Sequence, residues 1–416
     1  MKVLLVQSPT GRREVPIYPI GLAFLAGQLR GHSVIGSDLS VHVDAGSELR
    51  RVLAHTEPDV VALSLRNIDD SSYPNTYSYV EPFAALMNVL EDWDGTVVVG
   101  GTGFSIYPEI ILRKFPRIDY GLPGEGEETF PELLAYLEGK GDGPDGWRKD
   151  RLLPWGRVDL ESLALPDYSV IDVADYGIPD AVGVQSRRGC PFGCTYCTYG
   201  YLGGRGFRMR PLDRVMEDIE YLEFRGVRRF QFVDSVFNAP REYFLGLLEA
   251  LAGKNFSVKW SAWIDEKVTP DELRLMREAG AEKVDFSPDA ITDRGLELLG
   301  KRKRAASLLP AVETARKAGL QVGVNFFNGN PGEGLPAFLR KLFFMLLVRA
   351  KLGWKDTFVN IGTIRVYAHS PLASRMLEEG LVPPGTDFYD PVFYMCSRSA
   401  DVLYRFYKKL RGLRHG

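Results

Sequence analysis

Three of the four cysteines in this 416-residue chain lie close together, at Cys190, Cys194 and Cys197. They occur in the stretch GCPFGCTYCTYG, with the spacing C-x3-C-x2-C. Three thiolates on one short loop can hold an iron–sulfur cluster of four irons and leave the fourth iron open to another ligand. A zinc site and a chance grouping are the alternatives. Structural zinc usually has four ligands in two pairs, whereas the remaining cysteine, Cys396, is distant and the five histidines are scattered.

The elements that position this loop are predicted by apolar segments alternating with amphipathic ones. Segments that are typical of strands lie at 181–186, 228–234, 257–263, 282–287, 321–327 and 358–367. Helices are predicted between them, for example over 212–226 and over 269–280, where Thr269 is a candidate N-cap and Gly280 a stop. About six βα units favour a partial (β/α)6 barrel. The cysteines then follow its first strand, at the edge where α/β barrels build their active sites.

The first part of the chain has the same kind of alternation. Apolar strands are predicted over 2–8, 58–65 and 95–101, with helices over 21–31 and 81–93. Continuous apolar strands indicate a parallel sheet covered on both faces, so we expect a doubly wound, Rossmann-like domain. The predicted organisation is a first domain over 1–140, a linker over 141–180, the barrel over 181–370 and a C-terminal extension over 371–416. The first βα unit has no G-x-G-x-x-G motif and no Walker lysine, which disfavours dinucleotide and P-loop sites.

Composition narrows the class of protein. A formal net charge of -3 gives no indication of a nucleic-acid partner, and no apolar run is long enough for a membrane span. Few cysteines and no export signal favour a cytoplasmic location. The basic run Lys301-Arg302-Lys303-Arg304 is predicted to be a solvated loop.

The cysteine loop, with Tyr196 directly before its third cysteine, resembles the cluster loop of the radical S-adenosylmethionine (SAM) superfamily. The resemblance implies a [4Fe–4S] cluster on Cys190, Cys194 and Cys197, with SAM at the open iron. Three later stretches agree with it: FVDSVFN at 232–238, FNGNPGEG at 327–334, and IRVYAHSPL at 364–372. The residues that the resemblance implies for SAM binding are Tyr196, Asp234, Ser287, Asn325 and Arg365. Trp260, Trp263 and Asp289 are further pocket candidates, although the spacing of the two tryptophans puts them on opposite faces of a regular strand.

The first domain resembles the cobalamin-binding domain found ahead of such barrels. The resemblance rests on the glycine turn VVVGGTGF at 97–104 and on the segment GEGEETF at 124–130. The residues that it implies for cobalamin binding are Pro9, Tyr18, Pro19, Gly21, Ser64, Arg66, Asn67, Gly100, Gly101, Gly103, Phe104, Gly124, Glu125, Gly126 and Glu127.

One departure from that family concerns the ligand of cobalt. Methionine-synthase-type domains carry D-x-H-x-x-G after the first strand, but here that loop has no histidine, and Asp38 to His42 has the wrong spacing. We therefore predict cobalamin bound without a histidine from this domain. Arg66, after the third predicted strand, would present a cation toward the corrin. Pairing of Arg66 with Asp69, Asp70 or another carboxylate is the open alternative.

Together the resemblances imply a cobalamin-dependent radical SAM enzyme, a C-methyltransferase that moves a methyl group from SAM through methylcobalamin to carbon. Candidate catalytic residues are Asp234, Asn238 and Arg66. The implied partners are a small-molecule substrate, such as a natural-product or lipid intermediate, and an external one-electron reductant of the flavodoxin or ferredoxin type. A cyclase or rearrangement enzyme without net methyl transfer is one alternative, and a non-catalytic cobalamin sensor is another. Cys396 is expected to be a small buried apolar residue, and the open alternative is that it approaches the open iron of the cluster or acts on the substrate.

Overall fold

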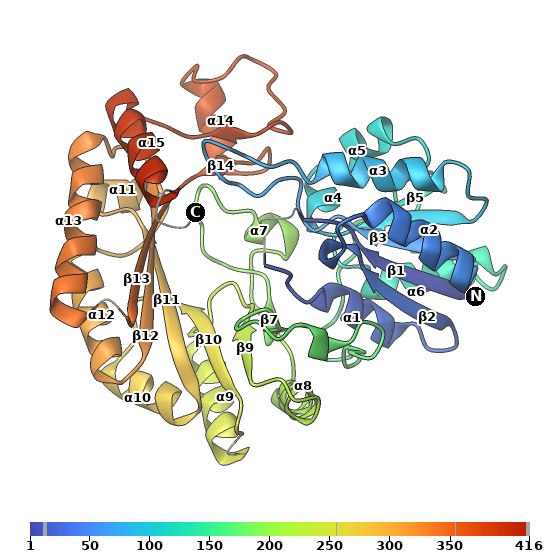
Figure 1. The fold of residues 1–416 in the computed structure, drawn as a ribbon, viewed down its shortest axis with the longest axis horizontal. Helices are drawn as coiled ribbons and strands as arrows, with labels where there is room; N and C mark the ends of the chain where they lie inside the picture. The colour runs from blue at the N-terminus through green and yellow to red at the C-terminus, as the bar shows by residue number, and fades with distance from the viewer. Residues whose placement is uncertain (11–14, 255, 354, 413–416) are drawn as a thin grey trace. The chain divides into compact units, whose positions relative to one another are not determined.

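The computed structural model describes residues 1–10, 15–254, 256–353 and 355–412, with 411 and 412 described by their backbone alone. Figure 1 shows that most of the chain consists of strands alternating with helices. The chain forms two compact units: the first comprises 1–70, 77–187 and 208–230, and the second 71–76, 188–207 and 231–416. The predicted linker 141–180 therefore packs as part of the first unit. No helix among the described residues is long and apolar enough to cross a membrane.

The first unit contains a five-stranded parallel sheet in the order β2-β1-β3-β4-β5. Its strands are β1 Lys2–Gln7, β2 Ser33–Asp38, β3 Val60–Ser64, β4 Thr96–Gly100 and β5 Tyr120–Leu122. Its helices are α1 Ile20–Gln28, α2 Ala45–Thr56, α3 Val80–Leu90, α4 Thr102–Ile106, α5 Pro108–Lys114, α6 Gly126–Leu137 and the later α8 Leu212–Phe224, with 3-10 turns η1 Leu39–Val41 and η2 Val173–Asp175. The predicted doubly wound sheet is confirmed.

The strand order of this sheet places its binding edge. β1 and β3 are neighbours, and the chain leaves β1 toward β2 on one side and later returns to β3 on the other. In doubly wound sheets ligands bind at the carboxyl ends of the strands where the order reverses in this way. The loops after β1 and β3 are therefore the expected binding edge. Pro9, Arg66 and Asn67 belong to them, and Ser64 is the last residue of β3.

The second sheet has six strands in the order β13-β12-β11-β10-β9-β6. These strands are β6 Gly183–Val184, β9 Arg229–Phe232, β10 Lys259–Ile264, β11 Ala281–Asp289, β12 Gln321–Asn328 and β13 Thr357–Thr363. β10 to β13 pair in parallel. The intervening helices are α9 Arg241–Lys254, α10 Pro270–Glu278, α11 Asp293–Leu298, α12 Leu308–Lys317 and α13 Leu335–Leu352, with the 3-10 turn η3 Ala305–Ser307. The order matches the predicted partial barrel.

Local signals in the sequence explain these elements well. Thr269 caps α10 by accepting from the amide of Glu272, whose carboxylate accepts from the amide of Thr269, and Gly280 follows with a φ of +96°. Trp260 is 1% exposed and Trp263 is partly buried. The register between β10 and β11 shifts between Trp260 and Ser261, so β10 is not the regular strand on which the prediction of opposite faces depends.

The last predicted strand, 358–367, is wrong in one respect. β13 ends at Thr363, and Arg365–Val366 form a separate short strand, β14, which pairs antiparallel with β15 Val392–Phe393. The remaining elements are β7 Arg187–Arg188, β8 Arg208–Met209, α7 Tyr199–Leu202, α14 Pro371–Glu378 and α15 Arg398–Gly412. Arg365 thus belongs to the pair that carries the C-terminal extension and not to the six-stranded sheet.

Candidate functional site

The cysteine loop is held at both ends by hydrogen bonds. Gly189 enters the loop with a φ of +80°, and a Cβ there would lie 2.1 Å from the carbonyl oxygen of Gly206. Ser235 Oγ donates to the Gly189 carbonyl at 2.8 Å, and the Thr195 amide donates to the Leu299 carbonyl at 3.0 Å. Only glycine fits position 189 without strain. Sequence reasoning missed Gly189, although its place directly before Cys190 was a usable signal.

All three thiols of the loop are free. Burial raises the pKa of Cys194 and raises that of Cys197 to about 11. Such thiols stay protonated near neutral pH, so binding of iron must release protons. Within the described ranges, no three His, Cys, Asp or Glu side chains lie close enough to share one metal ion. A four-iron cluster binds each cysteine through a different iron. The three thiols therefore fit such a cluster even though they do not converge on a single metal position.

Tyr196 is fixed by a buried network around Asp289. The Tyr196 hydroxyl donates to the Asp289 carboxylate, which also forms an ion pair with Lys301. Lys301 Nζ donates in addition to the Ser287 carbonyl at 2.5 Å. Burial alone would lower the pKa of Lys301, but the charges of Asp289 and Cys194 and the bond to Asp289 together raise it. The residue before Cys197 is therefore tied to the carboxyl end of β11.

Two more of the predicted SAM-binding residues lie near these features: Asn325 near the Asp289 network and Asp234 near the cysteine loop. Asn325 is two residues from Phe327 on β12, and side chains at that spacing share a face of a strand. The Phe327 ring meets the Tyr196 ring at 5.2 Å between centroids, so Asn325 faces the same side. Asp234 is 4% exposed and directly precedes Ser235, the residue that holds Gly189. Their SAM contacts remain predictions.

Arg365 and Asn238 are instead engaged with the chain itself. The buried Arg365 guanidinium donates to the Val366, Phe388 and Tyr389 carbonyls, the last two at 3.1 and 3.0 Å. The Asn238 amide accepts from the Asp265 amide at 2.8 Å and donates to the Asp265 carbonyl at 3.0 Å. Both side chains stabilise local structure, and their predicted roles toward SAM and in catalysis remain untested.

The FNGNPGEG stretch forms a second buried network. Glu333 is 1% exposed and pairs with Lys341 of α13, which is 0% exposed. The Glu333 carboxylate also accepts from the Ile291 and Thr292 amides, both at 2.8 Å. Asn330 donates to the Asp289 carbonyl at 2.8 Å, which joins the two networks. Cys396 lies at the edge of this network: it is exposed, contrary to our expectation, and its thiol donates to the Glu333 carbonyl at 2.9 Å.

The basic run was predicted to be solvated, which is wrong for two of its four residues. The side chains of Lys301 and Lys303 are 7% and 11% exposed, and Lys303 pairs with Glu266. Arg302 and Arg304 are exposed. The segment is extended, so alternate side chains point in opposite directions, and the inward ones meet carboxylates far away in the sequence.

In the first unit, Arg66 differs from most of its neighbours. It is partly exposed. Among the described residues its guanidinium forms no hydrogen bond or ion pair, either with Asp69 or Asp70 or with any other side chain. The Ser64 carbonyl accepts from Ser8 Oγ at 2.6 Å and so joins the ends of β1 and β3. The alternative of an Arg66–carboxylate pair is thereby disfavoured, and Arg66 remains available to a ligand at this edge.

Several predicted cobalamin residues pack within the protein. A Cβ on Gly101 would lie 2.7 Å from the Leu65 carbonyl oxygen, and one on Gly103 would lie 2.7 Å from the Asn67 carbonyl carbon. These glycines let the turn after β4 pack against the loop after β3. Tyr18 and Phe104 are core residues, 2% and 0% exposed.

Glu125 is also engaged within the first unit. Its carboxylate pairs with Arg208 and accepts from the Val158 amide at 2.9 Å. Gly21 has open space where a Cβ would lie, so close packing does not explain its glycine. Pro9, Pro19 and Gly124 lie in the loops after β1, before α1 and after β5, Gly100 is the last residue of β4, and Gly126 and Glu127 begin α6. The cobalamin contacts of this set stay a prediction.

The loop after β1 carries no histidine in its sequence. Asp38 and His42, the nearest residues of the sought types, have structural partners. Asp38 accepts from the Ser40 amide at 2.8 Å and from the Tyr176 hydroxyl, and His42 lies 3.9 Å from Glu48. That cobalamin binds without a histidine from this domain stays a prediction.

Comparisons with known proteins fit this geometry. The family profile described as B12 binding domain matches residues 10–134, and that of the Radical SAM superfamily matches residues 184–340. The uncharacterized methyltransferase PH0819 of Pyrococcus horikoshii is 28% identical over 80% of this chain and 75% of its own length. Hopanoid C-3 methylase of Methylococcus capsulatus is 25% identical over 74% of this chain, which spans only 60% of that protein.

Solved structures share the fold. Radical SAM methyltransferase TsrM from Kitasatospora setae, with tryptophan and a SAM analogue bound, superposes with a TM-score of 0.80 at 21% identity, over 91% of this chain and 76% of that one. The cobalamin-dependent SAM radical enzyme OxsB, with aqua-cobalamin and SAM bound, gives a TM-score of 0.74 at 15% identity, over 96% and 65%.

A doubly wound sheet followed by a six-stranded partial barrel with a three-cysteine loop defines the class of a cluster-binding α/β enzyme. Residues 10–134 match a B12-binding domain and residues 184–340 a radical SAM domain, so the chain has the domain order of cobalamin-binding radical SAM proteins. Its cofactors are therefore SAM, a [4Fe–4S] cluster and cobalamin. The three free thiols suit the cluster.

Proposed function

We propose that this protein is a cobalamin-dependent radical SAM methyltransferase. It moves a methyl group from SAM, by way of cobalamin, to a carbon centre of a small molecule such as a natural-product or lipid intermediate. The observation that carries the proposal is the order of the two sites along one chain: a B12-binding sheet, then a barrel whose first strand leads into three free cysteines. The methyltransferases among its relatives support the type of reaction.

The cofactors supply the chemistry, since the cluster and SAM provide a radical that activates carbon and cobalamin carries the methyl group. The protein binds and orients them. Tyr196, locked by Asp289, is suited to limit where SAM lies beside the cluster. Asp234, buried at the end of β9, is suited to accept a proton or hydrogen bond from SAM or substrate. Arg66 is suited to place a positive charge near the corrin, which disfavours extra positive charge on the metal.

Anaerobic reconstitution with iron, sulfide and cobalamin, followed by incubation with methyl-labelled SAM and cell extract, tests the proposal. We expect about four irons per chain, and label in a product that forms only when a reductant is present. Reconstituted protein that holds zinc and no sulfide, or that never cleaves SAM, would contradict it.

Ring closure without methyl transfer is the second candidate function. Anaerobic magnesium-protoporphyrin IX monomethyl ester cyclase of Synechocystis is 27% identical over 76% of this chain and 66% of its own length. This similarity is the observation in favour of ring closure. The labelled-SAM assay separates the two functions, because a cyclase consumes substrate without placing label in the product.

Two partners complete the proposal. Each SAM cleavage consumes one electron, so the enzyme requires an external one-electron reductant of the flavodoxin or ferredoxin type. The cysteine usage favours a reducing compartment, and we propose the cytoplasm as the place of action.

A further inference from the structure

A hollow of about 1030 Å³ lies beside the cysteine loop, within the second unit. Its walls are the first half of the loop, Pro191 to Cys194, the end of β10 with Asp265 and Lys267, α11, and the segment Gly300 to Arg304. We refer to it as the Cys194 hollow. Its lining includes none of the five residues predicted to bind SAM. The hollow thus reaches Cys194 from a side that none of those five residues lines.

The rim of the Cys194 hollow is cationic. Lys267 and Arg302 are exposed, and among the described residues their side chains form no ion pair. Arg304 is 84% exposed in its side chain and lies 3.7 Å from Asp293. Glu297, the other exposed acid of the lining, is paired with Arg294 at 2.8 Å. Two unpaired cations therefore remain in a chain whose formal net charge is -3.

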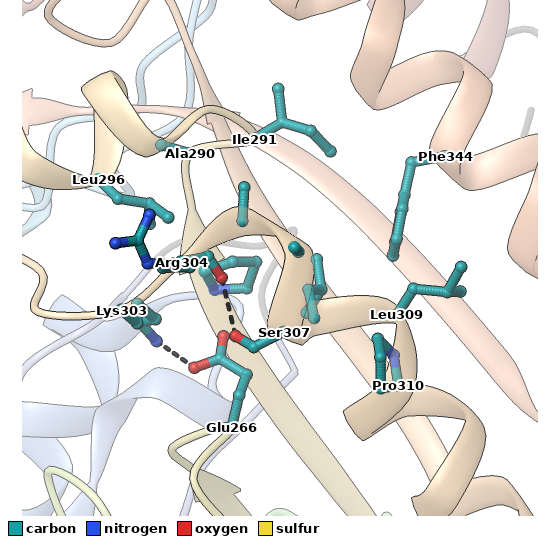
Figure 2. A pocket seen from close by; sticks show the side chains of 14 residues that line it. Glu266, Ala290, Ile291, Leu296, Lys303, Arg304, Ser307, Leu309, Pro310 and Phe344 are labelled. Atoms are coloured by element: carbon teal, nitrogen blue, oxygen red, sulfur yellow. Dashed lines mark hydrogen bonds and ion pairs between the residues drawn. The ribbon is translucent and has the colours of Figure 1, made fainter.

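Arg302 and Arg304 are presented by a segment that is firmly held. Lys301 pairs with Asp289 and Lys303 with Glu266, while Arg302 and Arg304 point to solvent. Figure 2 shows Lys303 reaching Glu266, and the Ser307 hydroxyl bonding to the Arg304 carbonyl, in the wall of an apolar pocket that Lys303 and Arg304 also line. Buried anchors at alternate positions fix the backbone, so the outward side chains start from defined places.

Apolar surface accompanies the charge. Phe192 is 46% exposed at the tip of the cysteine loop, two residues before Cys194, and Pro191 beside it is also exposed. Interfaces of transient redox partners are small, and complementary charge steers their encounter. An exposed ring inside a cationic rim fits a protein partner with an acidic surface around an apolar centre. A small anion would not need the exposed ring.

We propose that the Cys194 hollow is the docking surface for the electron donor, a redox protein with an acidic face. The proposal rests on the proposed function, because only an enzyme of this class needs such a donor. On docking, the donor is oxidised by one electron. This electron enters the cluster that Cys194 would help to hold. No bond forms or breaks and no proton is transferred in this step. Since electron transfer slows steeply with distance, the donor must approach the cluster closely, and the surface beside Cys194 allows this.

The test uses the reconstituted full chain and purified flavodoxin, an acidic electron carrier. The double variant Lys267→Glu, Arg302→Glu reverses the two unpaired rim charges. The matched control, Lys317→Glu with Arg340→Glu, makes the same charge change at exposed positions of α12 and α13, which do not line the hollow. Flavodoxin binding is measured by calorimetry at low and high salt, and cluster reduction by stopped-flow absorbance with flavodoxin hydroquinone and with dithionite.

We expect the rim variant to weaken flavodoxin binding at low salt by about tenfold or more, and to lose most of the salt dependence. Reduction by flavodoxin should slow in parallel, whereas reduction by dithionite should match that of the wild type. The control should bind flavodoxin as the wild type does. Equal affinities of the rim variant and the wild type would overturn the proposal, as would equal losses in the rim and control variants.

Two further outcomes separate this proposal from its premises. If the rim variant reduces normally with both donors but no longer binds a phosphorylated substrate or inorganic phosphate, the hollow is a ligand site and the docking proposal is wrong. If flavodoxin binding depends on the rim but labelled methyl never appears in a product, the docking surface stands and methyl transfer is the part that fails.

Discussion

Each unit contains one arginine that was predicted to bind a cofactor, and the two arginines differ in their contacts. In the loop after β3, the Arg66 guanidinium has no hydrogen-bond or ion-pair partner among the described residues. On β14, Arg365 donates to three backbone carbonyls, and its guanidinium lies 4.7 Å from the Tyr367 ring. Sequence resemblance assigned a cofactor to both. A side chain whose donors are already used by the backbone can reach a ligand only by giving up those bonds, so the structure supports Arg66 more than Arg365.

The same contrast separates other residues of the second unit. Lys341 and Glu333 form a buried ion pair and Asn238 forms partly buried hydrogen bonds, whereas the thiols of the cysteine loop have few bonds of their own. Residues of the first kind hold the frame of the site, and residues of the second kind are available to a cofactor. Substitutions should therefore separate into those that cost stability and those that cost activity.

The largest expected effect is the loss of a loop cysteine. Replacing Cys194 with Ala should lower methyl transfer by more than about a thousandfold, because even the outer partners of metal ligands typically contribute about 10–100-fold. Iron content after reconstitution should fall with it, while the unfolding midpoint of the metal-free protein should change little. Cys396→Ala is the matched control and should retain full iron content. Normal iron and turnover in Cys194→Ala would contradict the assignment of this cysteine to the cluster.

Lys341 tests the opposite class. Replacing Lys341 with Met removes one partner of a fully buried ion pair and leaves the Glu333 carboxylate without its counter-charge. We expect the free energy of unfolding to fall by about 3–5 kcal/mol. The control on the same helix is Lys351→Met, which removes an exposed pair with Glu313 at 3.1 Å and should cost less than about 1 kcal/mol. Denaturant unfolding measures both, and equal losses would show that burial of the pair is not what matters.

The two arginines can be compared directly. Arg365→Met leaves buried carbonyl oxygens without donors, at about 1–3 kcal/mol each, so unfolding should become easier by at least about 3 kcal/mol. Arg66→Met should change stability by less than about 0.5 kcal/mol. Arg66→Lys should instead alter the absorption spectrum of bound cobalamin and the turnover. Unchanged spectrum and turnover in Arg66→Lys would remove Arg66 from the cobalamin site.

Much of this frame could be predicted because its signals are local. The apolar strands, the Thr269 cap and the C-x3-C-x2-C spacing each depend on neighbouring residues, and all of the predicted strands appear in the structure. The cysteine spacing also located the loop correctly after the first strand of the second sheet. Short-range patterns of this kind carry their own geometry, so one sequence was sufficient.

The misses have the opposite character. Lys301 and Lys303 read as part of a solvated charge run because their partners, Asp289 and Glu266, lie 12 and 37 residues away along the chain. The break after Thr363 was hidden for the same reason, since Arg365 is held by carbonyls of residues 388 and 389. The local apolar pattern predicts a continuous strand at this place. The contacts of the Arg365 guanidinium with a distant part of the chain are not visible in that pattern.

A smaller effect concerns pH. Burial raises the pKa of the Cys197 thiol to about 11, against about 8.5 for a free cysteine. Between about pH 8.5 and pH 11 the folded, metal-free protein therefore keeps this proton, whereas the unfolded chain loses it. The contribution of the protonated thiol to stability is fully present below about pH 8.5 and is lost as the pH rises through 11. Alkylation of Cys197 by iodoacetamide, followed by mass spectrometry, should increase up to about pH 11. In guanidinium the same labelling should level off near pH 8.5, and identical profiles would contradict the shift.

The smallest expected effect belongs to the cysteine outside the loop. Cys396 is exposed, and its thiol makes one hydrogen bond, to the Glu333 carbonyl at 2.9 Å. Cys396→Ala should therefore lower stability by less than about 1 kcal/mol and leave turnover within about twofold of the wild type, because neither the cluster ligands nor the buried Glu333–Lys341 pair is touched. Cys396→Ser keeps a donor and should be indistinguishable from the wild type in both measurements. A tenfold loss of turnover in Cys396→Ala, with iron content intact, would show that this thiol takes part in the reaction and that an exposed position outside the loop can still belong to the site.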